Sequence, residues 1–150
     1  MLRENIQNAL KEAMKSQNVL ETNAIRMIVA GLKEKDVDAR GKGKAQAEDA
    51  DLLAMMQTMI KQRRESIEMF ISGGRPELAQ KEEAEIKIIE RFLPKQLSLS
   101  EVQEAVQAAI SETGAQSMKD MGKVMATLRA KYAGQMDFGA VSGIIKSLLS

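Results

Sequence analysis

The side chains that most often carry chemistry near neutral pH are missing from this 150-residue sequence, which contains no cysteine and no histidine. Without cysteine there is no disulfide, no thiolate nucleophile and no cysteine-based metal site. Without histidine the commonest general base and the commonest transition-metal ligand are also absent. Serines remain as nucleophiles, but Ser98, Ser100 and Ser117 stand where helix caps explain them. No glycine-rich phosphate motif occurs. We therefore predict no catalytic residues and no cofactor.

Carboxylates gather in one stretch of the sequence, between Lys81 and Arg91. Four acids on one helix could hold a divalent cation. Basic residues are interleaved with them at spacings of three and four, which favour ion pairs along a helix. We therefore predict ion pairs and no metal. The acids are Glu82, Glu83, Glu85 and Glu90, and the bases are Lys81, Lys87 and Arg91.

The strongest candidate for a working surface is the stretch from Ser117 to Tyr132. Its apolar residues recur at the spacing of one buried stripe, which predicts a single short amphipathic helix. Ser117 is the expected N-cap, with Asp120 three residues later in an acidic capping box. Gly122 costs about 1 kcal/mol relative to alanine inside a helix, so close approach of another backbone would explain it. Four bases face one acid here, and the candidate binding residues are Lys119, Gly122, Lys123, Arg129 and Lys131.

Two further basic clusters each leave two interpretations open. Arg40–Lys44 alternates basic residues with glycine and is either a flexible solvated loop or a loop that contacts phosphate. Lys61, Arg63 and Arg64 form either a nucleic-acid patch or a salt-bridged face, because Glu65 and Glu68 follow one turn on.

Composition limits the class of protein. The net charge is +1, so no strong overall field attracts nucleic acid or membrane. The N-terminus lacks the apolar segment of a signal peptide, and no apolar run approaches the roughly 18 residues that a membrane span needs. From these features we expect a cytoplasmic protein with no membrane partner.

Good helix formers dominate the sequence, and only two prolines interrupt it, at 76 and 94. This predicts an all-α fold. Asn18 with Glu21, Gly73-Gly74 with Pro76, and Ser98 with Glu101 mark helix boundaries. We expect a four-helix N-terminal subdomain with one long helix over residues 1–95, and a small three-helix bundle over residues 96–150. The expected helices span about 2–16, 18–38, 47–72, 76–93, 98–113, 117–132 and 137–149.

Three segments together resemble the YqeY family, in order and at the expected distances. They are Lys61-Gln62-Arg63-Arg64-Glu65-Ser66, Phe92-Leu93-Pro94-Lys95-Gln96-Leu97-Ser98 and Asp120-Met121-Gly122-Lys123-Val124-Met125. The resemblance covers essentially the whole chain and implies an all-helical protein with two subdomains. The sequence departs from the usual pattern after Tyr132, where Gly134-Gln135-Met136-Asp137-Phe138 forms the turn.

The same domain resembles the C-terminal tail of GatB, a subunit of the glutamine-dependent aminoacyl-tRNA amidotransferase. That tail contacts tRNA, whereas the chemistry occurs in a separate catalytic domain. The resemblance therefore implies a tRNA-binding accessory module, with an amidotransferase subunit or an aminoacyl-tRNA synthetase as protein partner. It also associates the family with carbon–nitrogen ligase activity that uses glutamine as amido donor. The alternative is a protein-interaction adaptor that neither binds RNA nor catalyses a reaction.

Overall fold

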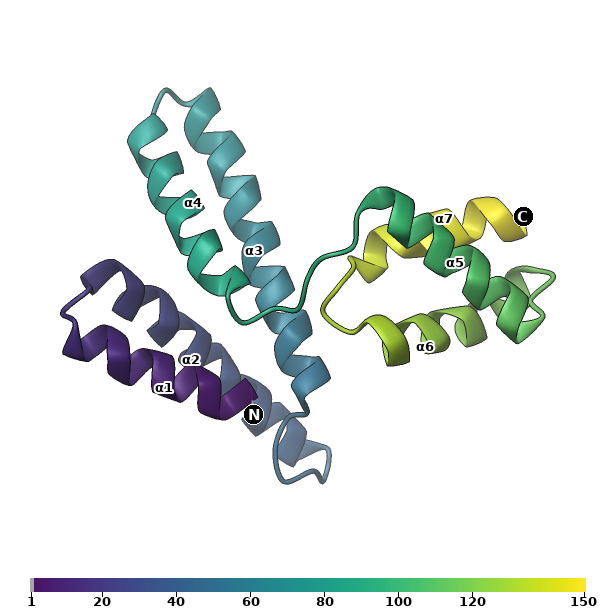
Figure 1. Cartoon of the computed structure of the whole chain (residues 1–150), viewed down its shortest axis with the longest axis horizontal. Coiled ribbons are helices and arrows are strands. Elements are labelled where there is room, and N and C mark those ends of the chain that lie inside the picture. The colour runs from purple at the N-terminus through teal and green to yellow at the C-terminus, as the bar shows by residue number, and fades with distance from the viewer. Residues whose placement is uncertain (1) are drawn as a thin grey trace. The chain divides into compact units, whose positions relative to one another are not determined.

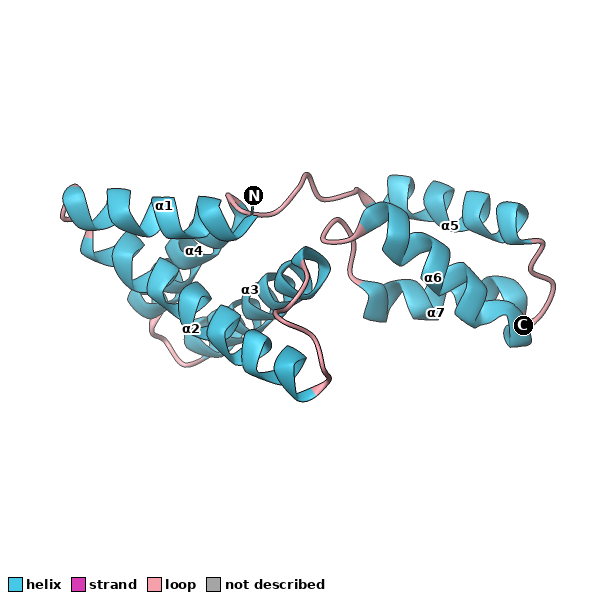
Figure 2. Cartoon of the chain, turned by 90° about the horizontal axis from the view of Figure 1, so that it is seen from below, coloured by secondary structure: helices cyan, strands magenta, loops and turns pink. Residues whose placement is uncertain are grey.

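The computed structural model describes residues 2–150, and these residues form seven α-helices and one short 3-10 helix, with no strand (Figures 1 and 2). This confirms the all-α prediction. The chain divides into two compact units, Met1–Pro94 (unit 1) and Lys95–Ser150 (unit 2). Each unit has its own hydrophobic core, and no residue belongs to both cores.

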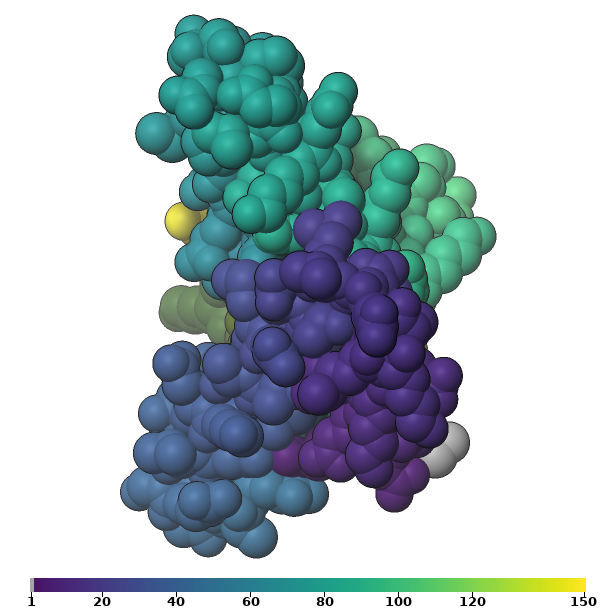
Figure 3. Space-filling model, turned by 90° about the vertical axis from the view of Figure 1, so that its left-hand side faces the viewer, coloured from purple at the N-terminus to yellow at the C-terminus, as the bar shows by residue number. Residues whose placement is uncertain are grey.

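Unit 1 consists of two helical hairpins, in which α1 packs against α2 and α3 packs against α4 (Figure 1). Contacts between α2 and α4 join the hairpins. In the space-filling view the side chains of α1 and of the first half of α2, in purple and indigo, form one continuous packed surface (Figure 3). The core is aliphatic and methionine-rich, and its fully buried members include Ile6, Ile25, Ile28, Leu52, Met56 and Ile89. The helices are α1 Leu2–Lys15, α2 Val19–Gly41, α3 Asp49–Ser72 and α4 Pro76–Glu90.

Local sequence accounts for most helix ends in unit 1. The Asn18 side chain accepts a hydrogen bond from the Glu21 backbone N–H at 3.1 Å and so caps α2. A capping box formed by Glu48 and Asp51 starts α3. Pro76 occupies the first turn of α4, where its missing N–H costs nothing.

The structure corrects two boundary and burial predictions in unit 1. The segment Arg40–Lys44 is not wholly a loop, because α2 continues through Gly41 and is nearly as long as α3. Ala39 is still buried on that last turn, so packing extends the helix past the residues whose composition predicted a loop. Ile71, predicted on the inner face of α3, is 61% exposed because it lies at the end of the hairpin, beyond the core.

Unit 2 is a three-helix bundle of α5 (Leu99–Thr113), α6 (Met121–Tyr132) and α7 (Phe138–Leu149). Ser98 and Glu101 form the expected capping box at the start of α5, and Gly114 ends that helix in the left-handed conformation, with φ 67°. The Leu97 N–H donates to the Gln135 carbonyl at 2.9 Å, which ties the entry of the unit to the turn between α6 and α7. The core includes Val106, Val124, Leu128, Val141 and Ile145, all fully buried.

The single helix predicted from Ser117 to Tyr132 is in fact two elements. Met118–Asp120 forms a 3-10 turn, and α6 begins only at Met121. Ser117 makes no capping bond with its side chain. The Asp120 carboxylate instead accepts a hydrogen bond from the Gln116 backbone N–H at 3.0 Å, upstream of the predicted cap. The predicted Ser117–Asp120 capping box is therefore wrong, because the Ser117 side chain caps nothing and the main hydrogen bond to Asp120 comes from Gln116.

Candidate nucleic-acid interface

Helix α6 separates a buried face from a charged one. Val124, Met125 and Leu128 are buried in the core of unit 2 and fix the rotation of the helix. The five candidate binding residues consequently lie on solvent-exposed parts of α6 and of the 3-10 turn before it. They are Lys119, Gly122, Lys123, Arg129 and Lys131.

These residues fall into two groups along the helix. Lys119, Gly122 and Lys123 lie at its N-terminal end, whereas Arg129 and Lys131 lie in its last turn. Within residues 2–150 no carboxylate lies within ion-pair distance of Lys119 or Lys123. The pKa of Asp120 is lowered, mainly by the hydrogen bond from the Gln116 backbone N–H, and the positive charge of Lys123 contributes at longer range.

Lys131 is engaged by α5. Its Nζ donates to Glu112 Oε2 at 2.6 Å, and this hydrogen bond raises the pKa of Lys131. Both side chains are about half exposed, so the pair is a surface contact that water and salt weaken. The sequence from Ser117 to Tyr132 has an excess of three positive charges, and pairing of Lys131 with Glu112 reduces this excess by one. The spacing of nearby residues could not predict this partner, since Glu112 is 19 residues from Lys131 in the sequence.

Arg129 lies over an aromatic ring. Its guanidinium carbon is 5.7 Å from the centre of the Phe138 ring at the start of α7, a distance at which the ring face attracts a cation. This contact orients the side chain without neutralising its charge. Phe138 thus belongs to this surface, although the apolar pattern of the sequence places it in the core.

Gly122 has no intramolecular reason to be glycine. A Cβ built on it would meet no neighbouring atom within 4 Å. Ala126 and Ala130 follow at intervals of four residues and are also exposed. Together the three small residues give α6 a flat strip between Lys123 and Arg129.

Arg63 and Arg64, from the basic cluster on α3, pair with acids of α4. Arg63 is buried, and its Nε donates to Glu85 Oε2 on α4 at 3.0 Å, with Glu82 3.9 Å away. The predicted pairing of this cluster with Glu65 and Glu68 is wrong, because the partners come from the neighbouring helix; Arg64 likewise lies 3.7 Å from Glu90. Arg91 pairs with Glu21 at 2.6 Å rather than with an acid of its own helix. Within residues 2–150 no group of three acidic side chains is arranged to hold a metal ion.

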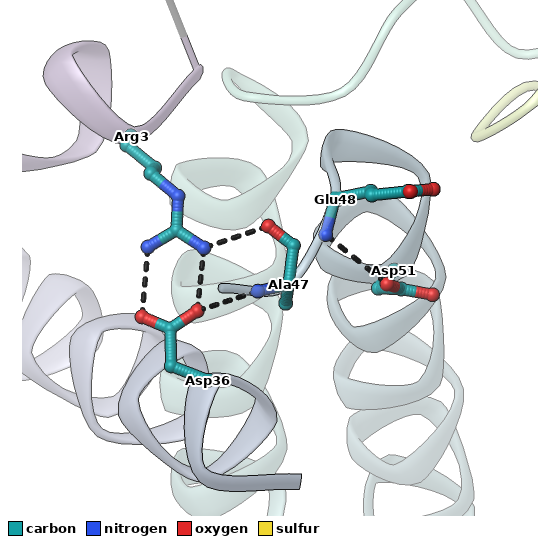
Figure 4. A network of polar contacts seen from close by, with 5 residues as sticks. All are labelled: Arg3, Asp36, Ala47, Glu48 and Asp51. Atoms are coloured by element: carbon teal, nitrogen blue, oxygen red, sulfur yellow. Dashed lines mark hydrogen bonds and ion pairs between the residues drawn. The ribbon is translucent and has the colours of Figure 1, made fainter. Parts of the chain in front are cut away.

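A buried polar network in unit 1 was not predicted from the sequence (Figure 4). Asp36 accepts two hydrogen bonds from Arg3, at 2.8 and 2.5 Å, and a third from the Ala47 backbone N–H at 2.9 Å. Arg3 also donates to the Ala47 carbonyl at 2.8 Å. The hydrogen bond from Arg3 is the main cause that lowers the pKa of Asp36 to about 2. The sequence does contain a hint of this network, because Asp36 follows Leu32 by four residues and so lies on the buried apolar stripe of α2. The network joins α1, α2 and the segment before α3, so it is structural.

None of the helices within residues 2–150 is both long and apolar enough to cross a membrane.

Comparison with known proteins finds relatives in three yeasts. The proteins named altered inheritance of mitochondria protein 41, mitochondrial, from Lachancea thermotolerans and Candida glabrata are 36% and 35% identical over 89 and 95 residues. These matches cover 59% and 63% of this chain, and 46% and 50% of the relatives. The protein of that name from Saccharomyces cerevisiae is 32% identical over 84 residues, 56% of this chain and 44% of its own. The chain therefore spans about half the length of the curated relatives it matches.

The names of these relatives overturn the cytoplasmic prediction, because they are called mitochondrial. That prediction was wrong because it relied on the lack of an apolar signal segment. Mitochondrial targeting uses amphipathic, arginine-rich segments, so a missing apolar segment does not distinguish the two compartments.

The family comparison covers nearly the whole chain. The sequence model of the family described as Yqey-like protein matches residues 3–149. This range includes nearly all of both units and all three segments on which the resemblance is based. This chain belongs to the YqeY family.

Proposed function

We propose that unit 2 binds tRNA as an accessory module, through the exposed face of α6. The observation that carries this proposal is the arrangement of that face, in which Gly122, Ala126 and Ala130 form a flat strip beside exposed lysines. A strip without large side chains lets a phosphate backbone approach closely, and the lysines neutralise its charge. The resemblance to the tail of GatB supports tRNA as the nucleic acid. Few aromatic side chains are available for base stacking, so shape rather than base sequence is recognised.

The geometry predicts how strongly salt weakens this binding. Each phosphate contact adds about 0.7–0.9 to the slope of log K against log salt. Lys119 and Lys123 alone give a slope of about −1.4 to −1.8, whereas all four bases give about −2.8 to −3.6. The larger value requires phosphate to replace Glu112 as the partner of Lys131.

A salt titration of binding to unfractionated tRNA tests the proposal. The double variant Lys119→Glu/Lys123→Glu reverses two charges on the proposed face, and Lys11→Glu/Lys15→Glu reverses two exposed lysines at the same spacing on α1. We expect loss of binding for the first pair only. Equal loss for both pairs, or no binding by the unaltered protein at low salt, would refute the proposal.

The association of the family with glutamine-dependent amidotransferases is consistent with an accessory role. With neither histidine nor cysteine in the chain, we propose that transamidation needs a separate catalytic subunit. We expect no glutamine-driven amidation of misacylated tRNA by the pure protein. Activity without an added subunit would contradict this assignment.

One observation favours the alternative of a protein adaptor. One of the four bases, Lys131, is already paired with an acid, Glu112, which leaves a smaller basic surface. Two results together would support the adaptor instead. This chain would not bind tRNA, and it would bind a purified amidotransferase subunit or aminoacyl-tRNA synthetase stoichiometrically.

A further inference from the structure

Unit 1 contains a groove that neither its own packing nor the proposed tRNA binding explains. Its volume is about 580 Å³, within the range of ligand-binding sites. All of its lining residues come from α2, α3 and the loop between them, and none comes from α4. It follows α2 from Met27 to Lys42. At 1.5 Å per residue this is a length of about 22 Å, or four helical turns.

The surface of the groove is adaptable and partly exposed. Met27, Met55 and Met59 line it, and methionine side chains adjust easily to different apolar partners. Met27 is 50% exposed although it is apolar. Ala30 and Ala54 are exposed on the two walls and leave room between the helices. The thioether of Met55 packs against Gly31, where an added Cβ would lie 2.7 Å from the sulfur.

Arg63 closes one end of the groove with unused hydrogen-bond donors. A guanidinium has five N–H groups. Three of those of Arg63 are used, by Glu85, by the Met59 carbonyl and by the Met27 sulfur, which is a weak acceptor. Two N–H groups therefore remain on a side chain that is only 8% exposed.

The charges around the groove argue against a phosphate or a nucleic acid as its occupant. Arg63 is already compensated by Glu85 and Glu82. The rim carries equal numbers of acids (Glu34, Asp38, Asp51) and lysines (Lys35, Lys42, Lys44). A full negative charge is not required, and a carbonyl or a partial charge suits Arg63 better. The C-terminus of a helix provides both, since its last carbonyls have no intrahelical partner and carry about half a negative charge.

We propose that this groove binds an amphipathic helix of about four turns from a partner protein, with the C-terminal end of that helix at Arg63. Small and aliphatic side chains of the helix contact the three methionines, and its polar flanks carry both signs of charge. Helix-in-groove recognition of this kind relies on apolar residues at intervals of three and four. The groove lies in unit 1, so this inference stands or falls independently of tRNA binding by unit 2.

Methyl NMR of the full chain labelled at methionine tests the proposal. The probe is a 16-residue model helix with alanine and leucine on one face, lysine and glutamate on the other, and uncharged ends. Its control has the same composition, with the apolar residues scattered around the helix. We expect saturable shifts of the Met27, Met55 and Met59 methyl signals with the first peptide only. Met14 and Met69 are exposed outside the groove and should not shift.

Substitutions on the groove walls separate binding from folding. Ala30→Glu/Ala54→Glu places charge on two exposed positions and should weaken the peptide at least about tenfold, as loss of a central contact does. Ala50→Glu is a matched control, because Ala50 is exposed on α3 but does not line the groove. Thermal unfolding should be nearly the same for all three proteins.

Three outcomes would overturn the proposal. The first is equal binding of both peptides, or shifts that include Met14 and Met69. The second is a change of the groove signals with protein concentration alone, since a second copy of the chain would then be the occupant. The third concerns orientation: a spin label at the C-terminus of the peptide should broaden Met27 more than a label at its N-terminus, and the reverse result excludes Arg63 as the receiver of the C-terminal end.

Discussion

The two units use charged residues in opposite ways. Unit 1 buries Asp36, Arg63 and Glu85 together with Thr22, and each of the charged residues has a partner on another element. No polar or charged side chain is buried in unit 2, whose core is apolar throughout. Buried ion pairs are costly to break but fix which helices meet. Exposed charges, such as those of Lys119 and Lys123 in unit 2, remain available for an external partner.

The sharpest test of this difference compares two glutamates that each pair with a base. Glu85→Ala leaves Arg63 buried with only the more distant Glu82, so we expect a loss of about 2–3 kcal/mol in the unfolding free energy of unit 1. Glu112→Ala removes an exposed partner of Lys131 and should leave unit 2 unchanged within error. Urea unfolding followed by signals from each unit measures both. Equal effects would show that the pairs do not differ as described.

Acid should weaken unit 1 through Asp36. Its pKa is lowered to about 2 in the folded chain, against an ordinary value of 3.8. The stabilisation from its ionised form is therefore complete above pH 3.8 and disappears as pH falls toward 2. Thermal unfolding of unit 1 between pH 4.5 and 2 should show this loss. Asp36→Asn should be less stable at pH 4.5 and should show a flatter pH dependence; an unchanged slope would exclude Asp36 as the cause.

Two serines in unit 2 provide a smaller test. Ser98 caps α5 in a capping box, so Ser98→Ala should cost about 1 kcal/mol. Ser117 makes no side-chain capping bond, and Ser117→Ala should have no measurable effect. Chemical unfolding of unit 2 compares the variants. A cost at Ser117 similar to that at Ser98 would restore the single capped helix that the sequence predicted.

The smallest effect is expected at Gly122. The site is helical and open around the missing Cβ, so Gly122→Ala should stabilise unit 2 by about 0.4–1 kcal/mol. If tRNA contacts this strip, the same substitution should weaken binding while the fold becomes more stable. Gly143→Ala on α7 is a matched control, because that helical glycine is equally open. Weaker tRNA binding by both variants would argue against a specific contact at Gly122.

Much of the fold was predictable because its determinants are local. The cap at Asn18, the box at Ser98 and Glu101, and the stop at Gly114 each depend on residues within four positions, and the structure confirms all three. The choice of partners for Arg63 and Asp36 was not predictable in this way. Arg63 is 22 residues from Glu85, and Asp36 is 33 residues from Arg3, so only tertiary packing decides these pairs.

The exposure of the candidate residues on α6 was predictable from the sequence, but their contacts with other helices were not. The apolar stripe of α6 correctly implies that its lysines are exposed. The stripe contains no information about Glu112 on α5 or Phe138 on α7, which change the environment of Lys131 and Arg129. Likewise, the spacing of the sequence pairs Asp120 with the backbone of Ser117, whereas in the structure its main hydrogen bond comes from the backbone N–H of Gln116.

The absence of any residue shared by the two cores has a consequence for exchange of backbone amide protons with solvent. Exchange from the interior of a helix requires the cooperative unit around it to open. Amides of α5, α6 and α7 should therefore share one protection level, and those of α1 to α4 another. A partner that binds only one unit will slow exchange in that unit alone, so a single experiment on the whole chain can identify which surface a newly found partner occupies.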